Sequence, residues 1–199
     1  LKRRFGRVYV TVNEPISVKE SLGLMKRPWA ELEEEERKEY LNRFAKHVTA
    51  EIQDVTVVTP STVAAMVLLS HDRRGMSRGD FHRRGGFFRR WMEDKGARFS
   101  DAWQSPEDAL DEALDMFADD GLAEILPESP GHAAAESDII AIPEDASARM
   151  RMDYYKNNIL FHFVPAALIC TAAERALGGG HDPQSIVLDE IAALPIVFI

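Results

Sequence analysis

The sequence predicts a mainly α-helical fold with a small β component. Several segments carry apolar residues three and four positions apart, which is the period of a helix that buries one face. Residues 7–12 (RVYVTV) alternate with period two and are mostly β-branched or aromatic, as in a strand. Residues 122–126 and 138–142 are short apolar runs on either side of a loop rich in Pro, Gly and Ala, which predicts a β-hairpin.

The first half of the chain should form this strand and two helices. Turn residues at 13–15 (NEP) end the strand. Residues 28–52 begin with a proline and carry apolar side chains at mostly helical spacing, which predicts a helix of several turns. Residues 62–70 (TVAAMVLLS) are mostly apolar and predict a buried helix, capped by residues 59–61 (TPS).

Three further helices should follow. Ser77 caps a short helix, and the glycine pair at 85–86 weakens its middle. Residues 105–108 (SPED) combine an N-cap, a proline at the first position and acids in the first turn, so they predict the start of a helix. Beyond the hairpin we expect a long helix over residues 150–177, ended by three glycines and kinked at Pro165 unless the helix breaks there.

Charge is distributed unevenly along the chain. Residues 72–98 carry nine Lys and Arg side chains against four carboxylates, whereas residues 101–145 carry no Lys or Arg. The net charge of −9 argues against a dedicated nucleic-acid-binding protein, because phosphate contacts dominate that affinity. The single cysteine, Cys170, excludes an internal disulfide and fits a reducing compartment. The longest apolar stretch, 159–173, is shorter than the roughly 20 residues of a membrane-spanning helix.

The order helix, short helix, longer helix and hairpin is that of a winged helix. A non-enzymatic winged-helix-like binding module is therefore one function class that the elements allow. In a DNA-binding version, the arginines of residues 73–90 would lie on or beside the recognition element. Against DNA, the glycine pair at 85–86 lies where a recognition helix should be rigid, and the following helix is strongly acidic. A solvated arginine-rich surface explains the same residues without DNA.

The residue patterns by themselves define no active site. A Gly-rich phosphate loop after a strand and a GxSxG nucleophile motif are both absent from the sequence. None of the six histidines has a partner at a metal-binding spacing, and none is followed by an aspartate five positions later. That last arrangement lets a carboxylate orient an imidazole base. We therefore predict no catalytic residue, no metal site and no cofactor within this chain.

Three blocks of sequence carry a family resemblance. Residues 137–170 (SDIIAIPEDASARMRMDYYKNNILFHFVPAALIC) contain D-I-I-x-x-P and, after a spacer, Y-Y-K-N-N-I. Residues 6–22 (GRVYVTVNEPISVKESL) and 59–81 (TPSTVAAMVLLSHDRRGMSRGDF) form the other two blocks. In this order they resemble the bacterial and mitochondrial type of glycerol-3-phosphate 1-O-acyltransferase, in the region after its catalytic blocks. Val12-Asn13 stands where Phe-Gly is usual, and residues 79–99 and the last twenty match little.

The resemblance implies a lipid-synthesis enzyme. The family transfers a fatty acyl group from acyl-CoA or acyl-carrier protein to the sn-1 hydroxyl of glycerol 3-phosphate, the first step of phospholipid synthesis. Its HxxxxD motif, which supplies the general base and the orienting aspartate, would precede Leu1, so no catalytic residue is carried onto this chain. Residues 1–27 would be the end of the acyltransferase domain, with its last strand and exit loop, and residues 28–199 a helical C-terminal region.

The resemblance also suggests a location. Both ends of the chain look cut, with no initiator Met and no polar tail, so we expect a fragment that is inactive alone. The family acts peripherally at the cytoplasmic face of the inner (plasma) membrane and binds no nucleic acid.

An arginine-rich and aromatic segment fits that location. The cations would attract anionic lipid or an acidic acyl-carrier protein, and the aromatic rings suit the headgroup layer. An ordinary arginine-rich surface over an aromatic core is the alternative. The candidate contact residues are Arg83, Arg84, Arg89, Arg90 and Trp91.

The segment at residues 154–158 (YYKNN) allows two interpretations. In one, Tyr154, Lys156 and Asn157 bind substrate by facing the acyl-donor or phosphate pocket. In the other, which we favour, the segment begins the long helix. Asn157 and Asn158 would then bond to backbone groups of a neighbouring element, because a buried amide is tolerated only when it is hydrogen-bonded.

Overall fold

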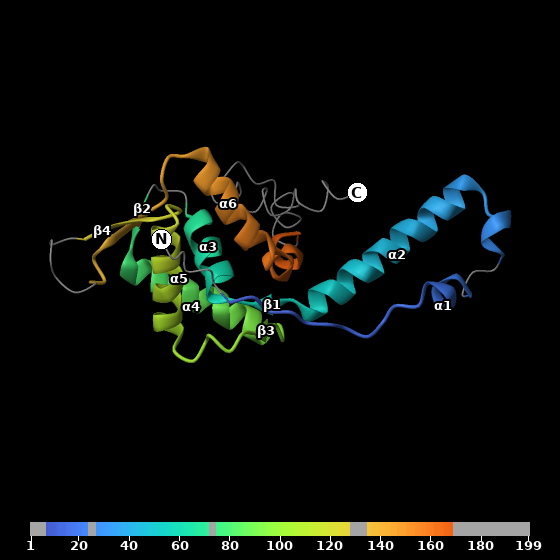
Figure 1. Cartoon of the computed structure of the whole chain (residues 1–199), viewed down its shortest axis with the longest axis horizontal. Coiled ribbons are helices and arrows are strands. Elements are labelled where there is room, and N and C mark those ends of the chain that lie inside the picture. The colour runs from blue at the N-terminus through green and yellow to red at the C-terminus, as the bar shows by residue number, and fades with distance from the viewer. Residues whose placement is uncertain (1–6, 24–26, 72–74, 128–134, 169–199) are drawn as a thin grey trace, which may run out of the picture. The chain divides into compact units, whose positions relative to one another are not determined.

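The structure is a computed structural model that describes residues 7–23, 27–71, 75–127 and 135–168 (Figure 1). Most of the regular structure is helical, with one small parallel and one small antiparallel sheet, so the mainly helical class is confirmed. The chain divides into two compact units. One is Tyr9–Thr56, and the other combines Leu1–Val8 with Val57–Ile199.

The unit Tyr9–Thr56 contains the predicted long helix, α2 (Glu34–Val55), preceded by α1 (Val18–Gly23) and the 3-10 helix η1 (Trp29–Glu31). α2 begins later than the predicted residue 28. The reason is a local cap: the Glu36 carboxylate accepts a hydrogen bond from the Glu33 backbone N–H at 3.0 Å, which satisfies a donor that the first turn leaves free.

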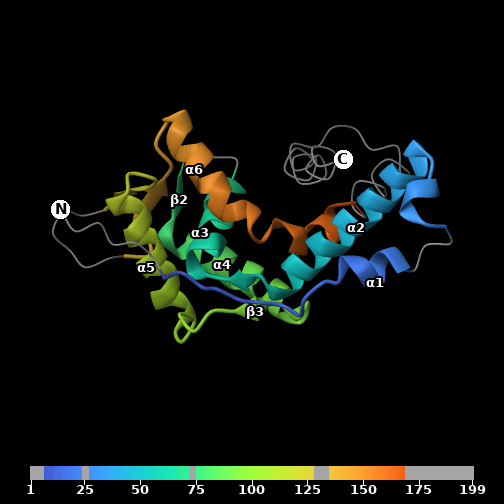
Figure 2. The same cartoon turned by 45° about the vertical axis from the view of Figure 1, so that its right-hand side comes forward.

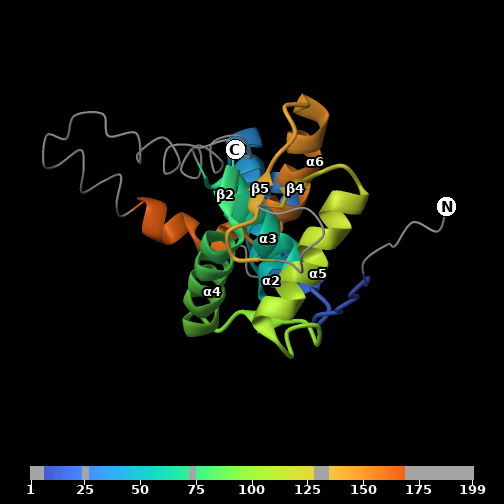
Figure 3. The ribbon, with the colours of Figure 1, turned by 90° about the vertical axis from the view of Figure 1, so that its left-hand side faces the viewer.

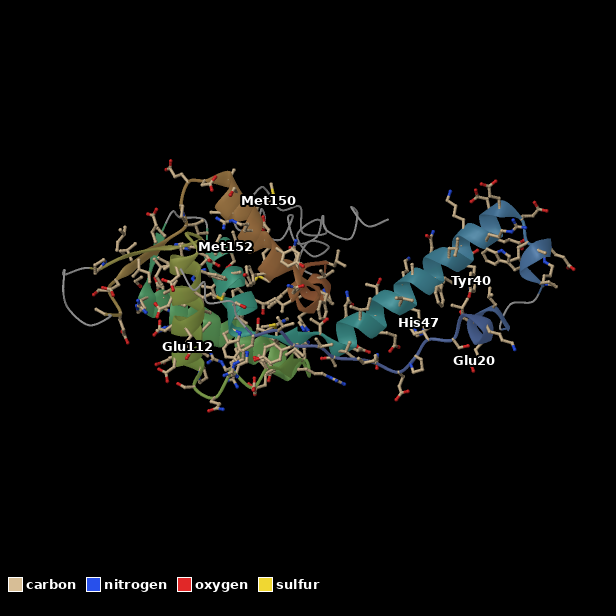
Figure 4. The ribbon with its side chains drawn as sticks, viewed as in Figure 1. Glu20, Tyr40, His47, Glu112, Met150 and Met152 are labelled. Carbon is tan, nitrogen blue, oxygen red and sulfur yellow. The ribbon has the colours of Figure 1, made fainter. Side chains whose placement is uncertain are left out.

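Tyr40 is the buried residue of α2 (Figure 4). Its hydroxyl donates to Ser21 Oγ at 2.8 Å, and its ring meets the Trp29 ring edge-on at a centroid distance of 5.6 Å. The Phe44 ring stacks on the Tyr40 ring at a centroid distance of 6.1 Å. This aromatic cluster holds α1 and η1 against α2 within the unit.

Residues 7–12 do not form the predicted strand. Val8, Val10 and Val12 have the alternation of a strand, yet they are 87%, 83% and 87% exposed. Neither sheet of the described residues includes this segment. A strand needs the regular hydrogen-bond ladder of a sheet, so the prediction of a strand is wrong for residues 7–12.

The second unit has α3 (Pro60–Leu69) at its centre. Every residue of α3 from Thr62 to Leu69 is buried, and the helix packs against α4 (Arg78–Asp94), α5 (Pro106–Asp119) and α6 (Ala146–Asn157). Figure 2 shows α3 between α6 and α4, and in Figure 3 α4 and α5 lie on either side of it. The predicted buried helix is therefore confirmed. It is apolar all round because neighbours cover it on several sides.

Two of the predicted helix starts are confirmed, with different caps. Thr59 Oγ1 accepts from the Thr62 backbone N–H, and the Thr62 hydroxyl accepts in turn from the Thr59 N–H at 3.2 Å. Pro60 occupies the first turn of α3. Ser105 precedes α5, with Pro106 in its first turn, but the serine side chain makes no capping hydrogen bond.

The predicted hairpin is confirmed and belongs to a three-stranded antiparallel sheet. β4 (Glu124–Leu126) pairs with β5 (Ile139–Ala141), and β5 pairs on its other edge with β2 (Gly75–Ser77), which the sequence did not predict. Ile140 lies opposite both Met76 and Ile125, which places apolar residues in register. A two-residue parallel pair, β1 (Val57–Val58) with β3 (Arg98–Phe99), was also not predicted.

α4 runs without interruption through its two adjacent glycines. Ser77 caps it, as predicted, by accepting from the Asp80 backbone N–H at 3.1 Å. Gly85 is buried against Leu110 of α5: a Cβ built at residue 85 would lie 2.5 Å from Leu110 Cδ1. The first glycine is therefore a requirement of helix packing and not a break in the helix.

The long helix predicted for residues 150–177 is wrong over its described part. α6 begins earlier, where Asp145 Oδ1 accepts from the Ser147 N–H at 3.0 Å, and ends at Asn157. Asn158 Nδ2 donates to the Tyr154 carbonyl at 3.1 Å, so its side chain takes part in the helix end. A 3-10 turn, η2 (Leu160–His162), and a helical turn at residues 164–168 follow.

Pro165 lies in the first turn of that last helical segment, so it does not kink a longer helix. Residues 169–177 of the predicted helix lie outside the described residues. On α6 itself, Met152 is fully buried while Met150 points outward (Figure 4). The helix therefore packs on the core through one face only.

Candidate functional site

The arginine-rich segment of α4 lines a groove against the start of α5. The groove has a volume of about 540 Å³, and we call it the arginine groove. Its lining residues are Gly79, His82, Arg83, Gly86, Arg89 and Arg90 from α4, Pro106, Glu107 and Leu110 from α5, and Glu136.

The structure divides the predicted contact residues between two sides of α4. Arg83, Arg89 and Arg90 line the groove, whereas Arg84 does not. Trp91 is half-buried: its Nε1 donates to the His162 carbonyl at 3.4 Å. The residues proposed as one patch therefore form a cationic groove and a separate aromatic contact.

The aromatic contact joins α4 to the segment after α6. Trp91 stacks on Phe163 at a centroid distance of 6.5 Å and an interplanar angle of 14°. Phe88 meets the same ring edge-on at 5.4 Å. Phe87 is the exposed ring of the three, with 54% of its surface accessible. The predicted contact residue Trp91 thus contributes, with Phe88, to packing within the unit.

The groove arginines differ in how they are held. The Arg89 guanidinium lies 5.6 Å from the Phe99 ring centroid and 5.9 Å from that of Trp103, and its Nη2 lies 3.5 Å from Glu93. Arg83 pairs with Asp80 one turn earlier. Arg90 is exposed, and no described carboxylate lies within ion-pair distance of it. One arginine is thus fixed by cation–π contacts and another is free to meet a ligand.

A network of charged side chains is connected to the groove through His82. Arg78 Nη1 donates to Asp111 Oδ1 at 2.5 Å, and His82 Nε2 lies 3.0 Å from the same oxygen. Arg78 Nε lies 3.9 Å from Asp138 Oδ2, which in turn accepts from the Ala135 backbone N–H at 2.9 Å. The network ties the start of α4 to α5 and to the segment before β5.

Sequence reasoning missed this network. Asp111 lies 29 residues after His82 on a different helix, so no local spacing connects them. The imidazole–carboxylate contact has the form of an oriented base, but Arg78 shares the carboxylate. None of the described groove-lining residues carries a hydroxyl or thiol. The polar groups that the described lining offers are therefore guanidinium groups, an imidazole and two carboxylates.

The predicted substrate-binding residues lie elsewhere, at the C-terminal end of α6. Tyr154 is 76% exposed, Asn157 is exposed, and Lys156 Nζ lies 2.8 Å from Asp153 one turn away. None of them lines the arginine groove. The structure does not bring these residues together with the predicted arginines.

The structural interpretation of the same segment needs correction. It placed Asn157 and Asn158 at the start of a helix with buried amides, but both are exposed and stand at the helix end. Asn158 bonds within its own helix and not to a neighbouring element. The residue of this segment that packs is Tyr155, whose ring meets Phe117 edge-on at 5.2 Å. Exposed amides next to water need no such partner.

The described residues also include a second pocket and a histidine with a shifted pKa. A smaller pocket of about 230 Å³ lies between the sheet and the start of α6, lined by Met76, Ile140, Pro143 and Arg149 among others. Partial burial of the His162 ring lowers its pKa below the usual value of 6.5. Over residues 7–23, 27–71, 75–127 and 135–168, no cluster of three or more His, Cys, Asp or Glu side chains could hold a metal ion.

None of the helices formed by the described residues is both long enough and apolar enough to cross a membrane.

Comparison with known proteins gives a consistent result. Residues 1–195 match the family described as the glycerol-3-phosphate acyltransferase C-terminal region. The chain is 24% identical over 181 residues to a glycerol-3-phosphate acyltransferase of Aeromonas hydrophila, with 88% of this chain and 21% of the relative covered. It is 25% identical over 198 residues to the enzyme of that name from Pseudomonas putida, covering 86% and 20%.

A third relative extends the match along the chain. It is a glycerol-3-phosphate acyltransferase of Colwellia psychrerythraea, 24% identical over 199 residues, with 96% of this chain and 23% of the relative covered. The chain thus spans about a fifth of the length of the curated relatives that it matches. No solved structure is significantly similar to it.

Proposed function

The chain belongs to the glycerol-3-phosphate acyltransferase C-terminal region family, and from this membership we propose that it is part of an enzyme of phospholipid synthesis. The enzyme transfers a fatty acyl group from acyl-CoA or acyl-carrier protein to the sn-1 hydroxyl of glycerol 3-phosphate. The observation that carries the proposal is the family match over residues 1–195.

Within that enzyme the chain supports catalysis and does not perform it. None of its six histidines is followed by an aspartate five positions later, so the chain lacks the HxxxxD base. That base would come from the part of the enzyme outside this chain. Residues 1–27 would belong to the end of the acyltransferase domain and residues 28–199 to the helical region, which is inactive by itself.

Contact with a surface or carrier would use the arginine-rich helix. Arg84 and Arg90 are exposed and have no carboxylate partner among the described residues, and Phe87 is the exposed ring beside them. These features support peripheral attachment at the cytoplasmic face of the inner membrane, or docking of an acidic acyl-carrier protein. Tyr154, Lys156 and Asn157 remain candidates for substrate contact from the exposed end of α6.

A non-enzymatic winged-helix-like module is the second candidate. The element order α3, β2, α4, α5, β4, β5, with strand order β2-β5-β4, supports a winged-helix-like arrangement. The recognition element predicted at residues 73–90 is followed by α5, which carries six carboxylates, including the exposed Glu112, and no Lys or Arg (Figure 4). Such a helix repels DNA phosphate. A gel shift with duplex DNA at two salt concentrations should therefore show no complex.

Acyl transfer is tested by comparing three proteins: the full-length enzyme, the enzyme lacking the residues of this chain, and the chain alone. Labelled acyl-CoA and glycerol 3-phosphate are supplied, and lysophosphatidic acid is measured. We expect product only from the full-length enzyme. Product from the isolated chain, or an unchanged rate without it, would contradict the supporting role.

Membrane contact is tested by co-sedimentation of the chain with lipid vesicles. Binding should require anionic lipid and weaken as salt rises, because surface charges are screened beyond about 10 Å at 0.1 M salt. Binding that is indifferent to both would exclude the electrostatic contact.

A further inference from the structure

We propose that the arginine groove is a binding site for the phosphate group of a small phosphate ester. The inference goes beyond the proposed acyl-transfer role, because it concerns only side chains of this chain and requires no catalytic motif. It rests on the spacing of the residues along α4, on an unexplained glycine, and on unused hydrogen-bond donors.

The groove residues of α4 recur at intervals of two helical turns. Arg83 and Arg90 are seven residues apart, as are Gly79 and Gly86. Residues seven apart lie on the same face of a helix, since seven residues complete about two turns. The groove therefore has two cations two turns apart on one face of α4, and two positions on the same face, Gly79 and Gly86, that carry no side chain.

Gly86 is not explained by packing. A Cβ built at residue 86 would meet only Arg90 Nη1, at an ordinary 3.5 Å, whereas one at Gly85 would overlap Leu110. A glycine inside a helix costs about 1 kcal/mol relative to alanine, so its presence needs a reason. Keeping the floor of the groove open for a ligand supplies that reason.

The groove holds donors that the protein does not use. Arg90 has no described carboxylate partner, and Arg83 pairs only with Asp80. Arg89 is held by two aromatic rings, makes one hydrogen bond at 3.5 Å, and keeps a buried Nε without a partner among the described residues. Guanidinium groups bind phosphate oxygens through two parallel hydrogen bonds, so such a cluster recognises a phosphate better than a single charge does.

His82 adds a further group at the wall of the groove. Its Nε2 is held by Asp111 at 3.0 Å, and its Nδ1 makes no hydrogen bond to a described residue. Asp111 is itself fixed by Arg78. The imidazole is therefore oriented before a ligand arrives, which lowers the entropic cost of binding.

Two carboxylates narrow the class of ligand. Glu107 and Glu136 also line the groove, so its three arginines face two opposing charges. An ester whose second end carries hydroxyl donors satisfies both sets of groups, while inorganic phosphate satisfies only the arginines. The groove volume of about 540 Å³ also exceeds what a lone phosphate fills and lies in the range of small-molecule sites, about 300–1,000 Å³.

The test is isothermal titration of the 199-residue chain with glycerol 3-phosphate and with inorganic phosphate, at constant ionic strength. Both should bind, and glycerol 3-phosphate should bind more tightly. The double variant Arg83→Gln/Arg90→Gln should lose roughly tenfold or more in affinity, because each substitution removes a charge-assisted hydrogen bond. The matched control is Arg98→Gln, which removes an exposed arginine of β3 that does not line the groove and should leave the affinity within about twofold.

A second variant tests shape without changing charge. Gly86→Leu should fill the floor of the groove and weaken binding, while its melting temperature shows that the chain still folds. Vesicles containing phosphatidic acid form a further arm: binding of these vesicles but of neither soluble probe, abolished by the groove variant, would identify a lipid headgroup as the source of the phosphate. Absence of any phosphate binding, or an equal loss in Arg98→Gln, would overturn the proposal.

Discussion

Gly85 and Gly86 are adjacent on α4, but alanine should affect them in opposite directions. A methyl group at residue 86 meets only Arg90 Nη1 at 3.5 Å, an ordinary contact with an exposed side chain. A methyl group at residue 85 would lie 2.5 Å from Leu110 Cδ1 and 3.4 Å from Cδ2, and Leu110 is almost completely buried. Comparing the stabilities of Gly85→Ala and Gly86→Ala therefore separates the effect of helix propensity from the effect of packing.

The expected magnitudes follow from these contacts. Replacing glycine by alanine within a helix stabilises it by about 1 kcal/mol, so Gly86→Ala should raise the free energy of unfolding by about that amount. Gly85→Ala gains the same propensity but overpacks the core, which costs about 1–3 kcal/mol, so the net change is a loss of roughly 0–2 kcal/mol. The difference between the variants, about 1–3 kcal/mol, contains no propensity contribution.

Urea unfolding followed by far-UV circular dichroism measures both values. The variant Leu110→Val removes the δ-methyl groups that the new Cβ would meet, so the combination Gly85→Ala/Leu110→Val should lose less stability than the sum of the single changes. Equal stabilisation by Gly85→Ala and Gly86→Ala would refute the close approach of α4 and α5 at this point.

Three other predictions concern single features of the second unit. Arg78→Met removes the cation that lies 3.9 Å from the buried Asp138 and should lower the free energy of unfolding by about 3–5 kcal/mol, whereas Arg78→Met/Asp138→Asn should lower it by less than the single change; an equal loss in urea melts would argue against the ion pair. Thr59→Ala should cost about 1 kcal/mol because it removes the cap of α3, while Ser105→Ala, whose side chain makes no capping bond, should be nearly neutral in the same assay. Burial lowers the pKa of His162, so the unfolded state takes up a proton first as the pH falls below 6.5; stability should be constant well above that pH and decline below it, and His162→Gln should reduce this decline in urea melts at a series of pH values, whereas an unchanged decline would contradict burial of the ring.

The sequence predicted those elements whose signals are local. The cap and proline at the start of α3, the serine before α4 and the acidic first turn of α5 each act within a few residues. α4 and α5 begin where predicted, and α3 begins two residues earlier than predicted. The hairpin was also predictable, because its two strands are close in the sequence and rich in apolar residues. The family resemblance was readable for a similar reason, since its motifs are contiguous blocks.

The sequence did not predict features that depend on a particular hydrogen-bond partner. Residues 7–12 have the residues of a strand but belong to neither sheet of the described residues. Asn158 ends α6 through a side-chain bond that competes with helix continuation. β2 is three residues long and exists because β5 offers it an edge. None of these outcomes can be decided from the composition of the segment itself.

The candidate site shows the same division. The sequence alone determined that α4 is rich in arginine and that two glycines interrupt its pattern. Only the tertiary structure shows that Leu110 packs against Gly85 and that Arg84 lies outside the groove. It also shows the contact between His82 and Asp111, which are 29 residues apart in the sequence. Local signals fix where helices begin because capping bonds span a few residues. A groove is decided by which helix faces meet, and that depends on packing between segments far apart in the chain.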